Sequence, residues 1–161
     1  TGDYVLKKGA TLPDGLFKDA CGESVRLHDL KGKYLFVEMS ARNCGPCQQM
    51  AKGEEQFIAD MKAKNIDVEV VTLLCPALED TLGETTTKML AGWIKSYKLT
   101  SPVLADRGWG LAMFEPAIGT DNVGYPSWAL VDPDLKVLDF ASGYGGFAEI
   151  EAAIEADAAN P

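Results

Sequence analysis

The 161-residue sequence has little histidine, no long apolar run and no excess of basic residues. Its one histidine, His28, leaves too few imidazole groups for most zinc sites, and only one Cys-x-x-Cys motif is present. Because no run of about 18 apolar residues exists, we expect no membrane span. Fifteen Lys and Arg residues against 24 Asp and Glu residues give a net charge of −9, which argues against nucleic acid as a partner.

Cysteine is also scarce, and an initiator methionine is missing. Four cysteines are too few for a disulfide scaffold at this length. The sequence begins Thr1-Gly2, so we expect a processed or trimmed form, from which a removed signal peptide or lipid anchor would leave no trace. No repeat or low-complexity linker divides the chain, and we expect residues 1–161 to form a single domain, with an N-terminal extension and hairpin over about residues 1–33.

Two of the cysteines, Cys44 and Cys47, lie where a predicted strand meets a predicted helix. The apolar run over residues 34–39 is typical of a buried strand, and no strong helix breaker follows Cys47. A thiol at a helix N-terminus faces unpaired N–H groups and the positive end of the helix dipole, which lower its pKa. Pro46, after Gly45, suits the first helical turn. The spacing brings both sulfurs to one face, where a disulfide can open and close.

The Cys-Gly-Pro-Cys motif after a buried strand resembles the active site of the thioredoxin superfamily. The predicted hairpin and the Leu-x-Asp-Leu-x-Gly-Lys segment at residues 27–33 make the chain similar to the TlpA/ResA-like branch, and also to thioredoxin-like modules that reduce methionine sulfoxide reductase. The resemblance implies an α/β thioredoxin-like fold: a central mixed sheet flanked by helices, with an N-terminal β-hairpin extension. It agrees with an order in which Cys44 is the exposed attacking thiolate and Cys47 the buried resolving thiol.

Periodicity and turn residues predict the remaining elements. We expect a hairpin of residues 16–19 and 24–27, strands at 66–74, 103–105 and 137–140 and after Pro126, and helices at 44–64, 82–97, 111–114 and 147–158. The helix at 82–97 is predicted to begin there because Thr81 and Glu84 have the spacing of a capping box.

The resemblance assigns a role to Glu38, which lies six residues before Cys44 on the apolar strand. In the resembled family, an acid at this position lies behind the buried cysteine and relays its proton, and we carry this role to Glu38. A charge there is costly to bury, and burial raises the pKa of a carboxyl group toward a useful range. The alternative is an acid at a sheet edge, exposed to water.

A second segment, around Pro126, resembles the superfamily's substrate groove. Pro126 stands where the family has a cis-proline that faces the Cys-x-x-Cys motif. With Gly45, Pro46 and Tyr125 it is expected to shape the groove, and the Tyr125 backbone is expected to pair with an extended peptide. Tyr125 is larger than the family's usual residue and narrows this groove, while Asn43 replaces the tryptophan common before the first cysteine.

Other interpretations of the motif are weaker. A peroxiredoxin-like peroxidase needs Pro-x-x-x-Thr/Ser-x-x-Cys, and Val37 and Ala41 stand at its two supporting positions. A copper chaperone of the Sco type needs Cys-x-x-x-Cys and a distant histidine, and the spacing here is wrong. The remaining alternatives are that the two cysteines form half of a zinc site, that they form a structural disulfide, or that the chain is a redox-inactive interaction module. Cys75 is interpreted as a buried small hydrophobe or a third redox thiol, and a bond from Cys21 to Cys75 stays open.

We therefore expect a thiol–disulfide oxidoreductase that reduces disulfides in partner proteins. Its expected partners are disulfide-containing protein substrates and an upstream electron donor. We expect no cofactor, since the cysteine pair carries the electrons and the tryptophans are better explained as core or rim. The resemblance and the missing Met suggest an extracytoplasmic protein, in the bacterial periplasm or tethered to a membrane, with a cytoplasmic location as the alternative.

Overall fold

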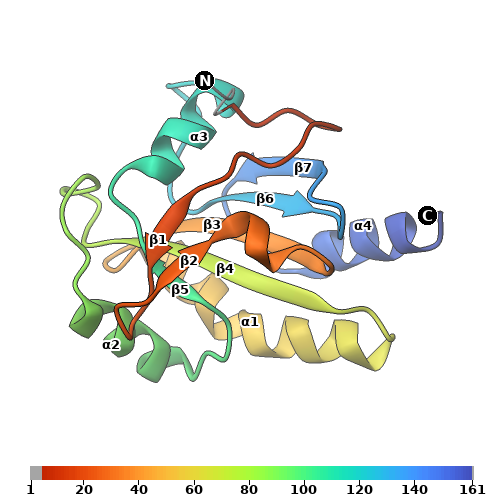
Figure 1. The fold of residues 1–161 in the computed structure, drawn as a ribbon, viewed down its shortest axis with the longest axis horizontal. Coiled ribbons are helices and arrows are strands. Elements are labelled where there is room, and N and C mark those ends of the chain that lie inside the picture. Colours follow the sequence, from red (N-terminus) through yellow and green to blue (C-terminus); the bar gives the residue numbers. More distant parts are fainter. Residues whose placement is uncertain (1–4, 161) are drawn as a thin grey trace.

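The computed structural model describes residues 5–160 (Figure 1). Residues 1–4 of the predicted N-terminal extension, and residue 161, lie outside the described part. The elements in chain order are β1 (Leu16–Lys18), β2 (Ser24–Arg26), the 3₁₀ helix η1 (Leu27–Leu30), β3 (Tyr34–Ala41), α1 (Gly45–Ala63), β4 (Val68–Cys75), α2 (Thr87–Tyr97), β5 (Val103–Ala105), α3 (Trp109–Ile118), β6 (Ser127–Val131), β7 (Val137–Ser142) and α4 (Ala148–Ala158).

A five-stranded mixed sheet, in the order β5-β4-β3-β6-β7, forms the centre of the fold (Figure 1). The middle strand, β3, runs parallel to β4 and antiparallel to β6. β1 and β2 form a separate antiparallel hairpin, in which Phe17 pairs with Val25. These arrangements confirm the predicted fold class, including the N-terminal hairpin.

The side chains of β3 alternate between two apolar layers, as the period of two in a strand requires. Phe36 packs in the layer beneath α1 and α4. Leu35, Val37 and Met39 pack in the layer beneath α3 and the hairpin. Every residue of β3 is buried, so an acidic residue on this strand has no direct access to water.

The second helix differs from the prediction. α2 begins at Thr87 rather than at residue 82, and its N-cap is Thr86, whose hydroxyl accepts a hydrogen bond from the Met89 backbone N–H at 3.2 Å. The preceding residue, Thr85, is buried and donates its hydroxyl hydrogen to the Leu74 carbonyl of β4 at 2.7 Å. This contact holds the chain before Thr86 on a non-helical path, so the capping box at Thr81 does not start a helix.

We expect Thr86→Ala to lower the free energy of unfolding by about 1 kcal/mol, because the Met89 N–H loses its cap. Thr87→Ala is the matched control, since Thr87 is exposed and no hydrogen bond among residues 5–160 uses its hydroxyl. Its effect should stay within about 0.5 kcal/mol. Urea denaturation of both variants measures the difference, and equal losses would contradict Thr86 as the cap.

The third helix is longer than predicted at both ends, spanning Trp109–Ile118 rather than 111–114. Its start is fixed by Asp106, whose carboxylate accepts hydrogen bonds from the backbone N–H groups of Trp109 and Gly110. Gly108, the N-cap, has a positive φ of 87°, a conformation that glycine adopts readily. No local pattern in residues 106–110 reveals that a buried carboxylate begins the helix.

Candidate active site

The cysteine pair lies at the junction of β3 and α1, as predicted. Cys44 is the N-cap of α1, and its Sγ atom accepts a hydrogen bond from the Cys47 backbone N–H at 3.2 Å. Pro46 lies in the first turn, after Gly45. A disulfide joins Cys44 and Cys47, with their Cα atoms 5.2 Å apart. When this bond opens, the helix N-terminus stabilises a thiolate on Cys44.

Both cysteines are buried, which corrects the expectation that Cys44 is exposed. The exposed fractions are 2% for Cys44 and 0% for Cys47. They pack in an apolar cluster with buried residues of β3, β4, β5, α1 and α2 and with one residue after α2: Ala41, Ala51, Leu74, Cys75, Leu90, Trp93, Leu99 and Val103. Six of these eight neighbours lie within residues 74–103, far from the motif in sequence, so a local pattern around the motif could not show that they cover it.

Asn43, just before the first cysteine, ties the loop after β4 to the motif. Its Oδ1 atom accepts a hydrogen bond from the Leu78 backbone N–H at 2.8 Å, and its Nδ2 donates to the Glu79 carboxylate at 2.8 Å. The second bond also lowers the pKa of Glu79. The loop is thereby held beside the N-terminus of α1, a function of Asn43 that the sequence did not indicate.

The segment before β6 faces the disulfide. The Tyr125 carbonyl oxygen lies 3.4 Å from the Cys44 Sγ atom, and the Tyr125–Pro126 peptide bond is cis. Burial, and next the nearby Cys75, raise the pKa of the Tyr125 hydroxyl. Burial, and next Asp106, raise the pKa of the Cys75 thiol to about 11. Both groups are therefore neutral near pH 7.

The two remaining cysteines are unpaired. Cys21 is exposed and Cys75 is buried, so the structure contains no bond between them. The interpretation of Cys75 as a small buried hydrophobe agrees with its place in the apolar cluster and with its raised pKa.

Glu38 lies in the middle of β3 and is fully buried. Its Oε2 atom accepts a hydrogen bond from the Ser40 hydroxyl at 2.5 Å, while Oε1 has no partner. Burial raises the pKa of Glu38 to about 7, although Ser40 and Thr72 oppose the shift. The alternative of an acid exposed at a sheet edge is wrong, because β3 is the central strand.

A model of the Redoxin family matches residues 7–154. The chain belongs to the Redoxin family. The thiol–disulfide oxidoreductase ResA of Bacillus cereus is 26% identical over 135 residues, covering 83% of this chain and 69% of that protein. The thioredoxin-like protein YneN of Bacillus subtilis is 27% identical over 154 residues, covering 94% and 81%. A crystal structure from Chlorobium tepidum, assigned as the thiol:disulfide interchange protein DsbE, superposes with a TM-score of 0.68 at 25% identity and covers 96% of both chains.

These findings confirm the thioredoxin-like fold, the ResA-like resemblance and the thiol–disulfide oxidoreductase hypothesis. ResA is named for that activity, and Cys44 and Cys47 form the bond that the activity requires. The peroxidase alternative is not supported. Val37 and Ala41 are buried apolar residues of β3, and they lack the proline ring and the hydroxyl group that the peroxidase motif requires.

This Redoxin-family site contains a second buried acid that the sequence interpretation missed. Glu54 of α1 is fully buried, and neither of its carboxyl oxygens has a hydrogen-bond partner. A signal was present: Glu54 follows Met50 and precedes Phe57 at helical spacing, which places it on the apolar face of the helix.

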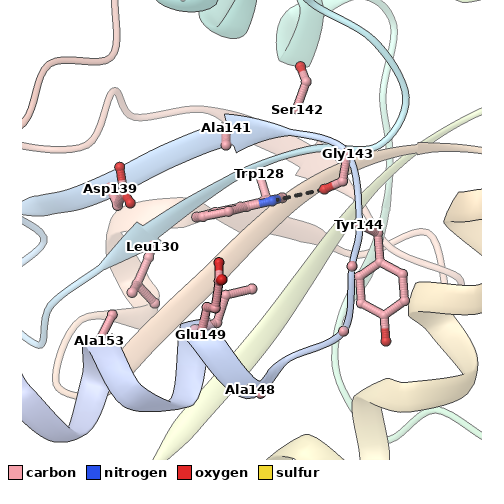
Figure 2. Close-up of a pocket in the computed structure, with 13 residues that line it drawn as sticks. Trp128, Leu130, Asp139, Ala141, Ser142, Gly143, Tyr144, Ala148, Glu149 and Ala153 are labelled. Carbon is pink, nitrogen blue, oxygen red and sulfur yellow. Dashed lines mark hydrogen bonds between the residues drawn. The ribbon is translucent and has the colours of Figure 1, made fainter.

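One described pocket lies away from the cysteines. It has a volume of about 570 Å³ and lies between β6, β7 and the start of α4, where the Trp128 indole N–H donates to the Gly143 carbonyl at 3.1 Å (Figure 2). None of the predicted site residues lines it. Among residues 5–160, no three or more His, Cys, Asp and Glu side chains gather as metal ligands. No helix in this part of the chain combines the length and hydrophobicity that crossing a bilayer requires.

Proposed function

We propose that this Redoxin-family protein reduces disulfide bonds in partner proteins and is itself reduced again by an upstream dithiol donor. The observation that carries the proposal is the Cys44–Cys47 disulfide at the N-terminus of α1, beside the Tyr125 carbonyl. The Gly-Pro dipeptide between the cysteines is also that of the reducing thioredoxins that the sequence resembles.

The proposed reaction moves two electrons to the substrate. The Cys44 thiolate attacks a partner disulfide, forming a mixed disulfide and releasing one partner sulfur as a thiolate. The Cys47 thiol then loses its proton, and the resulting thiolate attacks the Cys44 sulfur. The second partner sulfur leaves as a thiolate, and the Cys44–Cys47 disulfide forms. An incoming dithiol reverses these steps on the protein and is oxidised to a disulfide.

Glu38 is the proposed acceptor of the Cys47 proton. Its burial and its pKa of about 7 support this role, since a proton acceptor works best when its pKa is near the working pH. Below this pKa the carboxyl group is protonated and cannot accept, so resolution of the mixed disulfide should slow as the pH falls through 7.

The proposed substrate groove is built from Gly45 and Pro46 on one side and from Tyr125 and Pro126 on the other. The short distance from the Tyr125 carbonyl to the Cys44 sulfur supports this arrangement. An extended peptide would pair with the Tyr125 backbone, and the tyrosine ring would restrict the groove to small side chains.

We also propose that the protein acts outside the cytoplasm, where disulfides in partner proteins form and persist. The net charge of −9 supports protein partners over nucleic acid. Fractionation of the source cells with an antibody to this chain would test the location.

The first test is a titration of the cysteine pair in defined thiol–disulfide buffers. A reductant should have a potential near or below about −250 mV, whereas about −120 to −180 mV would indicate an oxidant or isomerase. Cys21→Ser should be used throughout, because Cys21 is an exposed free thiol that would react with labelling reagents. Thiol labelling with mass detection follows the fraction reduced. Failure of the pair to cycle would contradict the proposed function itself.

A further inference from the structure

Glu54 lies on the same face of α1 as Cys47, two turns further along the helix. The buried residues of α1 are Cys47, Met50, Ala51, Glu54, Phe57 and Met61, and they define the face that packs on the sheet. At 1.5 Å per residue, Glu54 lies about 10 Å beyond Cys47 along the axis. It is the one acidic side chain on this buried face.

Glu38 reaches the same depth in the molecule from the strand side. It lies about 10 Å before the end of β3 at Ala41, given 3.3 Å per residue. It shares the α1-facing side of the strand with Phe36, and its register partner in β4 is Thr72. Both carboxyl groups thus lie about 10 Å from the junction, in the buried layer between β3 and α1, and the charge of Glu38 acts on Glu54.

The groups between them are short of hydrogen bonds. One oxygen of Glu38, both oxygens of Glu54 and the Thr72 hydroxyl are buried without a partner. No salt bridge among residues 5–160 includes Glu38 or Glu54, so no cation compensates their charge. Two ionised carboxylates in an apolar layer would repel each other and lose their hydration. The pair must therefore retain at least one proton near neutral pH.

We propose that Glu38 and Glu54 form one proton-sharing carboxyl pair, which as a unit takes up the proton of the Cys47 thiol. This inference rests on the proposed function. Before the mixed disulfide is resolved, the S–H bond of Cys47 breaks, its electron pair stays on the sulfur, and an O–H bond forms on the pair. The Cys47 thiolate then attacks the Cys44 sulfur, and the second partner sulfur leaves as a thiolate. The pair carries a single negative charge while it waits for the proton, whichever of its two members holds it.

The ionisable groups around the pair are few. On α1, Cys47 lies nearer the junction, and Glu55 adds negative charge beside Glu54. On β3 and β4 the neighbours are the neutral hydroxyls of Ser40 and Thr72. From the loop before α4, Tyr144 lies against Gly53, and burial together with the charge of Glu54 raises the pKa of its hydroxyl. All of these groups are neutral or negative, so they favour retention of the shared proton.

Tyr144 also lines the pocket of Figure 2, where its side chain extends toward α1. Burial, and next the charge of Glu38, hold the pKa of Glu54 well above its ordinary value. The raised pKa values of both carboxyl groups agree with one proton held between them.

The test measures the rate at which Cys47 resolves a mixed disulfide between pH 5 and 9, in Glu38→Gln, Glu54→Gln and the double variant. Each single variant should stay within about tenfold of the wild type, since the other carboxyl group still ionises and accepts the proton. In Glu38→Gln the pKa of Glu54 should fall, because the repulsion from Glu38 is gone. The double variant should resolve the mixed disulfide about 10²- to 10⁴-fold more slowly than the wild type. Its rate should also no longer show the carboxyl-dependent rise with pH.

Asp60→Asn is the matched control, because Asp60 is an acid of the same helix whose carboxylate accepts a hydrogen bond from Gln56 and does not act on the pair. Its pH profile should match that of the wild type. If Glu38→Gln alone loses as much as the double variant, Glu54 takes no part and the inference is overturned, while the proposed function stands.

Infrared spectroscopy of the oxidised wild-type protein gives a measurement that needs neither turnover nor a mutant. A shared proton predicts the carbonyl stretch of a protonated carboxyl group at pH 8, where an isolated glutamate is ionised. The band should disappear at that pH in Glu54→Gln. Absence of the band from the wild-type protein would overturn the proposed pair even if the protein cycles normally. Presence of the band would support the pair even if the protein does not cycle.

Discussion

Cys44→Ala is expected to abolish the reduction of partner disulfides, whereas Cys47→Ala should stop the reaction half-way. Cys44 is the N-cap of α1, where the backbone N–H of Cys47 and the helix dipole stabilise its thiolate. Removing this nucleophile should lower turnover about 10³-fold or more. In Cys47→Ala the first attack still occurs, but no second thiolate resolves the product, so a mixed disulfide accumulates.

Reduction of a model disulfide protein, followed by non-reducing electrophoresis and mass spectrometry, distinguishes the two variants. Cys21→Ser is the matched control, since it removes an exposed thiol far from the pair in sequence and should leave turnover unchanged. Accumulation of the adduct in Cys44→Ala instead of Cys47→Ala would reverse the proposed order of attack. Full activity in either variant would exclude the pair as the redox centre.

The position of the cysteine pair could be predicted because it depends on local patterns. An apolar strand, two cysteines around Gly45-Pro46, and a helix without breakers are neighbours in sequence, and the structure keeps them in that order. Helix-start chemistry then places Cys44 at the N-terminus of α1 without any knowledge of the rest of the fold. Strand and helix types followed from periodicity for the same reason.

The surroundings of the pair could not be predicted because they depend on distant contacts. Cys44 is buried in a cluster with α2 residues such as Leu90 and Trp93, and Asn43 holds the loop after β4 beside the motif. The start of α2 likewise depends on Thr85 bonding to a carbonyl of β4. Spacing within a segment contains no information on which distant strand will accept its hydrogen bonds.

Glu54 is an intermediate case. Its place on the buried face of the helix can be predicted from helical spacing, but its proximity to Glu38 cannot. An acid on the buried face of a helix contradicts the apolar pattern, and such contradictions between levels often mark functional positions. The position of Glu38 relative to Glu54 depends on the register of β3 with β4 and on the packing of α1 over both strands. Only the fold brings these two acids into the same buried layer between β3 and α1.

Phe36→Ala is expected to cause the largest loss of stability. Phe36 is fully buried, and its ring lies 5.5 Å from that of Trp128, 5.4 Å from Phe147 and 6.1 Å from Phe57. Alanine would leave a cavity at the point where β3, β6, α1 and α4 meet. Such truncations cost about 3–5 kcal/mol, which is a large share of the 5–15 kcal/mol typical of a domain.

Urea denaturation of the oxidised protein measures this loss, and Leu16→Ala serves as the control because Leu16 is 59% exposed. The control should change the free energy of unfolding by less than about 0.5 kcal/mol. A loss below about 1 kcal/mol for Phe36→Ala would mean that the neighbouring rings close the cavity.

The Phe36 ring also holds α1 against β3, two residues before Glu38. Relaxed packing in Phe36→Ala should therefore also shift the pH profile of mixed-disulfide resolution. A large loss of stability with an unchanged profile would show that the acid pair is positioned by the strand register alone.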